Sequence, residues 1–160
     1  MQKITPFLWF DKEAEEAANY YVSAFPNSKI KKVEKYPKAA EEVAGKPTGS
    51  VMTVEFELGG MTFVALNGGP VPGFKFSPAT SFVVNCETQE EIDNLWGKLS
   101  AVPEAEQCGW CTDKYGITWQ IVPTILDELL SDPSKTEKVT AAFLKMKKFD
   151  IEALKKAAER

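Results

Sequence analysis

Two stretches of this chain repeat one pattern, in which an apolar strand runs into an acidic helix start. Residues 10–21 align with residues 85–96, with a pair of glutamates and an asparagine in register. A shorter match between residues 60–63 and 116–119 extends the repeat toward the end of each copy. The repeat therefore predicts two copies of a unit in which a strand and a helix are followed by further strands.

Composition excludes several functional classes. At 160 residues the chain is long enough for one domain with a real core, or for two small halves. A net charge of −4 argues against a nucleic-acid surface, which needs a basic stripe to neutralise phosphates. No apolar stretch approaches the roughly 20 residues of a membrane span, and the start of the chain does not read as a signal peptide. Three cysteines fit a reducing compartment, so we expect a cytoplasmic protein.

The first copy reads as a strand over residues 3–10 and a helix with an apolar stripe that ends at Pro26. Asp11 is the expected N-cap, because acidic residues crowd the first turn behind it. A polar strand follows over residues 29–36, and residues 37–50 contain enough Gly and Pro to predict a loop.

A hairpin is the clearest local prediction. Residues 51–58 and 61–66 flank Gly59-Gly60, which tolerate the positive φ of a two-residue turn. Alternation separates two faces. The predicted core face comprises Val54, Phe56, Leu58, Met61, Phe63 and Ala65. The mixed face comprises Thr53, Glu55, Glu57, Thr62, Val64 and Leu66.

In the second copy, strands are expected over residues 79–86, 107–112 and 116–122, and Thr88 and Glu91 form a capping box for the helix. Alternation predicts a face that carries Ser81, Val83, Asn85, Thr118, Gln120 and Val122. The remaining residues, 124–130, 135–147 and a segment capped by Asp150, read as helices.

The chain resembles the PhnB-like family, often labelled 3-demethylubiquinone-9 3-methyltransferase-like, of the vicinal oxygen chelate superfamily of glyoxalases, bleomycin-resistance proteins and ring-cleaving dioxygenases. The matching stretches are residues 4–11, 14–21, 65–70, 82–86, 108–110 and 113–123. The resemblance implies an α+β fold with tandem βαβββ modules that form a curved mixed sheet. We expect paired modules at about 3–66 and 79–123 in one domain (1–123), a C-terminal helical extension (124–160) and a homodimer.

The resemblance also implies a site in the cup of the sheet. The superfamily's metal-ligand positions fall at Ile4, at Ala79 or Ser81, near Val64 and at Gln120. None is a histidine or a carboxylate, and the chain has no histidine, so we predict no metal and no cofactor. A methyltransferase would need a glycine-rich strand-to-helix turn, which the sequence does not show.

The predicted cup wall still carries groups that could bind a small molecule. The candidate ligand-binding residues are Thr62, Ser81, Asn85, Trp110, Thr118 and Gln120. The competing interpretation is a polar sheet face that meets only water. Trp9 and Trp119 are expected on the helix side, whereas Trp110 could border the cup.

Two further patterns have a functional and a structural interpretation. Glu55 and Glu57 share one strand face, so one could act as a general base, but a solvated strand face is the preferred interpretation. Cys108 and Cys111 have CxxC spacing, yet they lie in a predicted strand without a second cysteine pair, which favours structural thiols.

These patterns favour a small-molecule binding protein without a metal. The alternatives are an isomerase or lyase that uses Glu55 or Glu57 as general base, a metal-dependent enzyme, and an interaction module without a ligand.

Overall fold

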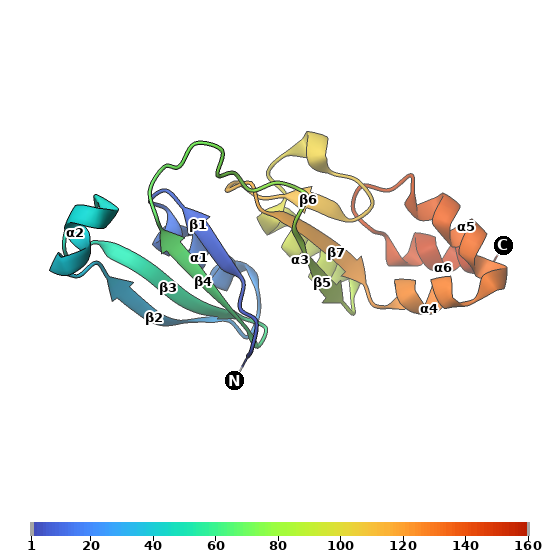
Figure 1. Cartoon of the computed structure of the whole chain (residues 1–160). Coiled ribbons are helices and arrows are strands. Elements are labelled where there is room, and N and C mark those ends of the chain that lie inside the picture. The colour runs from blue at the N-terminus through green and yellow to red at the C-terminus, as the bar shows by residue number, and fades with distance from the viewer. Residues whose placement is uncertain (1, 160) are drawn as a thin grey trace. The chain divides into compact units, whose positions relative to one another are not determined.

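The computed structural model describes residues 2–159 and divides the chain into two compact units, one up to Phe74 and one from Lys75. Each unit contains its own sheet, so each is described by itself (Figure 1). The mixed α+β fold and the C-terminal helices predicted from the sequence are confirmed. Within residues 2–159, no helix combines the length and the apolar character that crossing a membrane would require.

The first unit contains the complete strand order of one module. Its elements are β1 (Phe7–Phe10), α1 (Ala14–Ala24), β2 (Lys29–Lys35), α2 (Lys38–Ala44), β3 (Val51–Leu58) and β4 (Met61–Asn67). The sheet order is β1-β4-β3-β2, in which β1 is parallel to β4 and the other pairs are antiparallel. The hairpin register is confirmed, with Leu58 opposite Met61 and Phe56 opposite Phe63.

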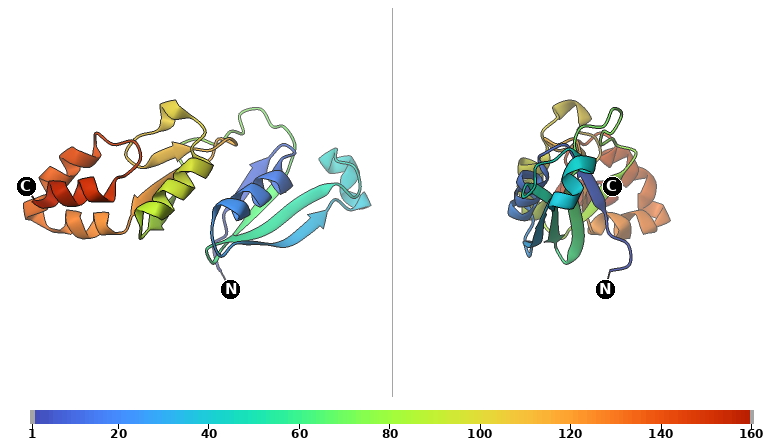
Figure 2. Two further views of the ribbon diagram at one scale, coloured as in Figure 1. Left: turned by 180° about the vertical axis from the view of Figure 1, so that it is seen from behind. Right: turned by 60° about the vertical axis from the view of Figure 1, so that its left-hand side comes forward.

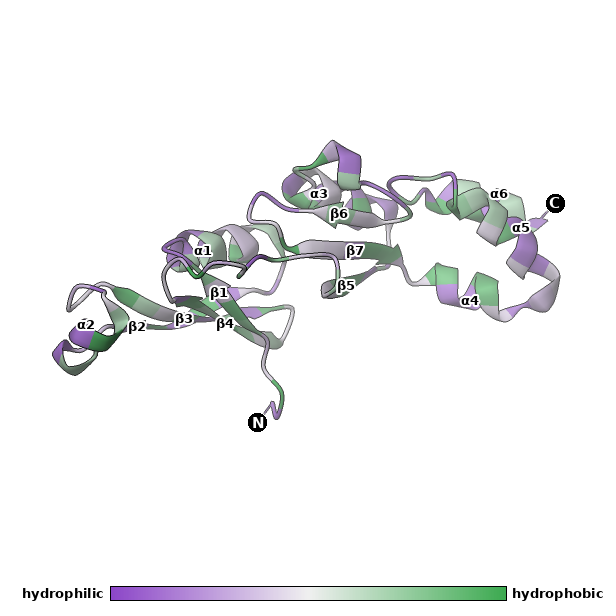
Figure 3. Cartoon of the chain, turned by 45° about the horizontal axis from the view of Figure 1, so that its top comes forward, coloured by the Kyte–Doolittle hydropathy of each residue, from purple (hydrophilic) through white to green (hydrophobic). Residues whose placement is uncertain are grey.

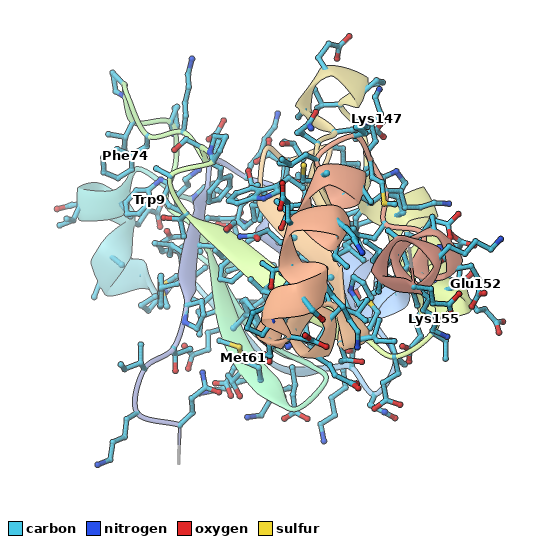
Figure 4. The ribbon with its side chains drawn as sticks, turned by 90° about the vertical axis from the view of Figure 1, so that its right-hand side faces the viewer. Trp9, Met61, Phe74, Lys147, Glu152 and Lys155 are labelled. Carbon is cyan, nitrogen blue, oxygen red and sulfur yellow. The ribbon has the colours of Figure 1, made fainter. Side chains whose placement is uncertain are left out.

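Helix α1 covers one face of this sheet, and the view from behind shows it lying over the strands (Figure 2). Its alanines are buried, which allows close approach, and Tyr21 stacks on Phe56 with ring centroids 6.1 Å apart. Phe56 in turn stacks on Phe63 at 5.5 Å. Burying these rings removes apolar surface from water and favours the fold. The predicted core face is confirmed except for Met61, which is exposed at the hairpin turn (Figure 4).

The second unit begins with a shorter version of the module. Its elements are β5 (Ser81–Cys86), α3 (Gln89–Leu99), the 3-10 turn η1 (Pro103–Ala105), β6 (Trp110–Thr112) and β7 (Thr118–Pro123). The sheet order is β5-β7-β6, with β5 parallel to β7. In the order of elements along the chain, η1 follows the helix of the second unit as β2 follows the helix of the first. The capping box predicted from Thr88 and Glu91 is confirmed.

Three C-terminal helices complete the second unit: α4 (Ile125–Ser131), α5 (Pro133–Phe143) and α6 (Ile151–Glu159). Apolar and polar residues alternate along α4 (Figure 3). Asp150 caps α6 as predicted, because its Oδ1 accepts a hydrogen bond from Ala153 N at 2.9 Å. Gln89 joins the tail to α3, since its side chain donates to Phe149 O and accepts from Ile151 N.

Three predictions of where the helices and strands of the first unit begin or lie were wrong. The first strand begins at Phe7 instead of residue 3, and the segment expected to be a loop contains helix α2, which ends at Gly45 in the left-handed conformation. Asp11 does not cap α1. The backbone N–H of Ala14 instead donates to Asn67 Oδ1 at 2.8 Å, so the end of β4 supplies the cap.

Candidate functional site

The open sheet face of the second unit, opposite α3, carries most of the predicted ligand-binding residues. The strand pairing confirms the predicted alternation and arranges the side chains of this face in rows across three strands. The rows are Ser81–Thr118–Thr112, Val83–Gln120–Trp110 and Asn85–Val122. Three hydroxyls therefore lie in one row, beside a second row that holds an amide and an indole.

Ser81 and Gln120 are joined directly. Gln120 Nε2 donates a hydrogen bond of 2.9 Å to Ser81 Oγ, which ties β7 to β5 across the open face. This bond orients the amide and leaves its carbonyl oxygen as an acceptor. Trp110 is the register partner of Gln120 on β6. Asn85 is exposed and Trp110 is half-buried, so both are within reach of a molecule on this face.

Thr118 is the unusual member of this face. It is only 3% exposed. Its hydroxyl oxygen, Oγ1, is buried and has no hydrogen-bond partner within residues 2–159. A buried hydroxyl without a partner costs about 1–3 kcal/mol. Native proteins satisfy nearly all such groups, so each exception calls for a specific explanation.

The open sheet face of the first unit, opposite α1, carries Glu55, Glu57 and Thr62 as predicted. Lys31, at a bulge in the edge strand β2, organises this face. Its Nζ lies 2.9 Å from Glu55 Oε1 and donates to Thr62 Oγ1 at 3.4 Å. The two glutamates are half-buried, which supports neither a deeply buried base nor a fully hydrated pair.

Aromatic side chains lie on the same face of the first unit. Trp9 pairs with Leu66 and is 37% exposed, and Phe7 is 59% exposed. The expectation that Trp9 lies on the helix side was therefore wrong, because in β1 it is Leu8 and Phe10 that are buried. Trp9 Nε1 donates to Gly69 O at 2.9 Å, and its ring meets Phe74 edge-on at 5.2 Å (Figure 4).

The CxxC pair does not lie in a strand as predicted. Cys108 and Gly109 form a turn with φ of 48° and 82°, and only Cys111 belongs to β6. Burial raises the pKa of the Cys111 thiol to about 12 and that of Cys86 to about 11. The Cys108 thiol donates to Phe143 O at 3.5 Å. These surroundings agree with the structural interpretation of the thiols.

Sequence reasoning missed two buried polar residues that position these faces. The Asn67 side chain caps α1 and donates to Val51 O, and its backbone carbonyl oxygen accepts a hydrogen bond of 2.6 Å from the Tyr36 hydroxyl. Asp113 is 1% exposed and accepts from the backbone N–H groups of Tyr115 and Ile117 and from Trp119 Nε1. Asn67 and Asp113 each lie within a stretch that matches the family, and this match was the signal by which sequence reasoning could have found them.

The donor set does not fit a divalent metal. Within residues 2–159, no three His, Cys, Asp or Glu side chains lie close enough together to hold a metal ion. Gln120 and Ser81 offer neutral oxygens, and a divalent cation normally needs several anionic or imidazole ligands.

Comparison with known proteins places this geometry in a family. Residues 2–122 match the family model described as 3-demethylubiquinone-9 3-methyltransferase. The chain is also 36% identical to the PhnB protein from Bacillus cereus, over 77% of this chain and 100% of that one, with a TM-score of 0.64. This chain belongs to the PhnB-like family. The predicted family is therefore confirmed over both sheets.

A second solved structure agrees in fold alone. A protein from Pseudomonas aeruginosa is 18% identical to this PhnB-like chain, with a TM-score of 0.54, and the match covers 77% of this chain and 98% of that one. Among curated proteins, none matches.

Proposed function

We propose that this PhnB-like protein binds a small organic molecule in the cup of an open sheet face and does so without a metal. The observation that carries the proposal is the open face of the second unit. Three adjacent strands bring five predicted binding residues onto this face: Ser81, Asn85, Trp110, Thr118 and Gln120. Convergent polar groups beside apolar and aromatic side chains are typical of small-molecule sites.

Metal independence rests on the donor set. The superfamily's ligand positions hold Ile4, Ser81 or Ala79, Val64 and Gln120, and Ile4 is an exposed residue ahead of β1. Of these side chains, only Ser81 and Gln120 offer oxygen atoms, and they bond to each other. We therefore expect recognition through hydrogen bonds instead of coordination.

Methyl transfer is not part of the proposal, although the family description names it. A nucleotide-like cofactor is normally cradled by a glycine-rich turn between a strand and a helix. Within residues 2–159, the connections that lead from a strand into the following α-helix contain no glycine; they comprise residues 11–13, 36–37, 87–88 and 124. The glycines instead lie in the hairpin turn, in other loops and within α3.

We further propose that modules pair between two copies of the chain to complete the cup, so that the working form is a homodimer. Exposed apolar residues on the open faces, Phe7 and Trp9 in the first unit and Val83 in the second, support such pairing. Three free thiols, two of them buried, support a cytoplasmic protein. Light scattering at several protein concentrations measures the dimer, and a concentration-independent monomer contradicts it.

Isomerase or lyase chemistry with Glu55 or Glu57 as general base is the less favoured alternative. The Lys31–Glu55 ion pair gives the Glu55 carboxylate a structural partner. Small-molecule binding requires no general base, and the polar groups on the open face of the second unit support binding directly.

Native mass spectrometry of the purified full-length protein, with elemental analysis of the same sample, tests the proposal. An organic adduct without stoichiometric metal supports it. A stoichiometric divalent metal contradicts the metal-free site. A protein that carries no adduct and binds none of the small aromatic probes described below contradicts binding itself.

A further inference from the structure

The matching threonines of the repeat differ in their hydrogen bonds. Thr62 and Thr118 occupy the same position in the segments 60–63 and 116–119. Thr62 Oγ1 accepts a hydrogen bond from Lys31, whereas Thr118 Oγ1 has no partner among residues 2–159. The second unit has η1 where the first has β2, so it lacks the strand that supplies the lysine. The buried Thr118 hydroxyl therefore lacks the partner that its counterpart has.

The strands of the second unit also carry no charge. Strands β5, β6 and β7 contain no Lys, Arg, Asp or Glu, whereas β2 and β3 of the first unit contain seven such residues: Lys29, Lys31, Lys32, Glu34, Lys35, Glu55 and Glu57. An ionised ligand on the uncharged face would lose hydration without gaining an opposite charge. An uncharged ligand loses less hydration and can still use the hydroxyls and the amide.

We propose that the open face of the second unit selects an uncharged molecule with a flat ring and an attached carbonyl or amide group, and that Thr118 supplies one of its hydrogen bonds. This inference rests on the proposed function and names its ligand class. Trp110 provides a flat apolar surface in the row next to Thr118, and Gln120 lies between β5 and β6 with its carbonyl oxygen available.

The hydroxyl row can receive such a group. Ser81 and Thr112 flank Thr118 on the neighbouring strands, and both are half-buried, so a ligand group would reach the buried Thr118 hydroxyl from an end of the row. A threonine hydroxyl both donates and accepts, and it can therefore pair with a carbonyl oxygen or an amide N–H. One such bond also removes the cost of leaving Thr118 Oγ1 unsatisfied.

Three probes that share one ring but differ in charge test the ligand class: benzamide is uncharged, benzoate is an anion and benzylamine is a cation. Each is titrated to millimolar concentration into the full-length ¹⁵N-labelled protein. The Trp110 indole N–H and the Gln120 side-chain amide are the reporter signals. We expect benzamide to shift both signals and to bind about tenfold more tightly than either charged probe, because an unpaired ion is desolvated at a cost.

Substitutions test the role of Thr118. Thr118→Val keeps the shape and removes the hydroxyl, and it should weaken benzamide binding roughly fivefold. Thr118→Ser keeps the hydroxyl and should retain binding. Thr53→Val removes a threonine hydroxyl from β3 of the first unit, outside the proposed face, and should leave benzamide affinity unchanged. Thermal unfolding of each variant verifies that it is folded.

Three results overturn the inference. An affinity for benzoate or benzylamine that equals or exceeds the affinity for benzamide removes the selection for uncharged molecules. Benzamide binding by Thr118→Val that is as tight as binding by the unmodified protein shows that the Thr118 hydroxyl does not bond to the ligand. If no probe shifts the reporters while native mass spectrometry detects an organic adduct, the inferred ligand class is wrong, although small-molecule binding stands. If neither is seen, both fail.

Discussion

The open sheet faces of the two units are built from matching segments of the repeat, yet they carry different chemistry. In the first unit, Lys31 crosses from the edge strand to Glu55 and Thr62, so the polar groups satisfy one another. In the second unit the edge strand is absent, Gln120 bonds to Ser81, and Thr118 has no partner. The difference teaches that an added edge strand can supply the side chain that completes the hydrogen bonds of a sheet face.

A glycine turn in the second unit, at Gly109 ahead of β6, and one in the first, at Gly59 between β3 and β4, should differ most in their tolerance of a side chain. Gly109 has a φ of 82°, and a Cβ there would lie 2.3 Å from the Phe149 ring and 2.9 Å from Ile121 O. Gly59 also has positive φ, but no atom lies within 4 Å of its Cβ position. Gly109→Ala should therefore lower the free energy of unfolding by about 3 kcal/mol, from strain and overlap together, and Gly59→Ala by about 1 kcal/mol.

Urea denaturation of both variants measures this difference. Equal losses would mean that the tail does not press on the Gln107–Gly109 turn. The turn is otherwise well held, since Cys108 N donates to Met146 O at 2.9 Å and Gly109 N donates to Lys147 O at 2.7 Å.

The helix caps of the two units provide the next comparison. Helix α3 is capped by its own Thr88, whereas α1 depends on Asn67 from β4. Asn67→Ala leaves the buried Ala14 N–H and Val51 carbonyl without their side-chain partner and should cost about 2 kcal/mol. Asp11→Ala, at the cap position expected from sequence, should cost less than about 0.5 kcal/mol. Urea denaturation of both variants measures these changes. A larger loss of stability from Asp11→Ala than from Asn67→Ala would contradict the assignment of Asn67 as the cap.

The outcome for these caps shows what sequence alone could predict. Elements that depend on neighbouring residues, such as the Gly59-Gly60 hairpin, the capping box of α3 and the alternation of β5 and β7, were predicted correctly. The Asn67 cap, the Asp113 network and the exposure of Trp9 were missed, because they depend on which residues distant in sequence meet. Likewise, alternation placed Thr118 on the correct face, but only the structure reveals that its hydroxyl has no partner.

The matching threonines should also differ in their effect on stability without a ligand. Thr118→Val removes a buried hydroxyl that has no partner, so the free energy of unfolding should stay unchanged or rise by up to about 1 kcal/mol. Thr62→Val breaks a long hydrogen bond on a half-buried surface and should change it by less than about 0.5 kcal/mol. Thermal unfolding of ligand-free protein measures both. A marked loss from Thr118→Val would indicate that its hydroxyl is already satisfied within the folded chain.

The smallest effect is expected at the ion pair of the first unit. Both side chains of the Lys31–Glu55 pair are 36% exposed, so water screens their attraction. Glu55→Gln should therefore lower the free energy of unfolding by no more than about 0.5 kcal/mol. It should also leave the binding of benzamide unchanged, since this residue belongs to the other face. Urea denaturation and the benzamide titration test both statements. A loss of several kcal/mol, or of binding, would mean that the two faces do not act separately, and would return attention to Glu55 as a functional group.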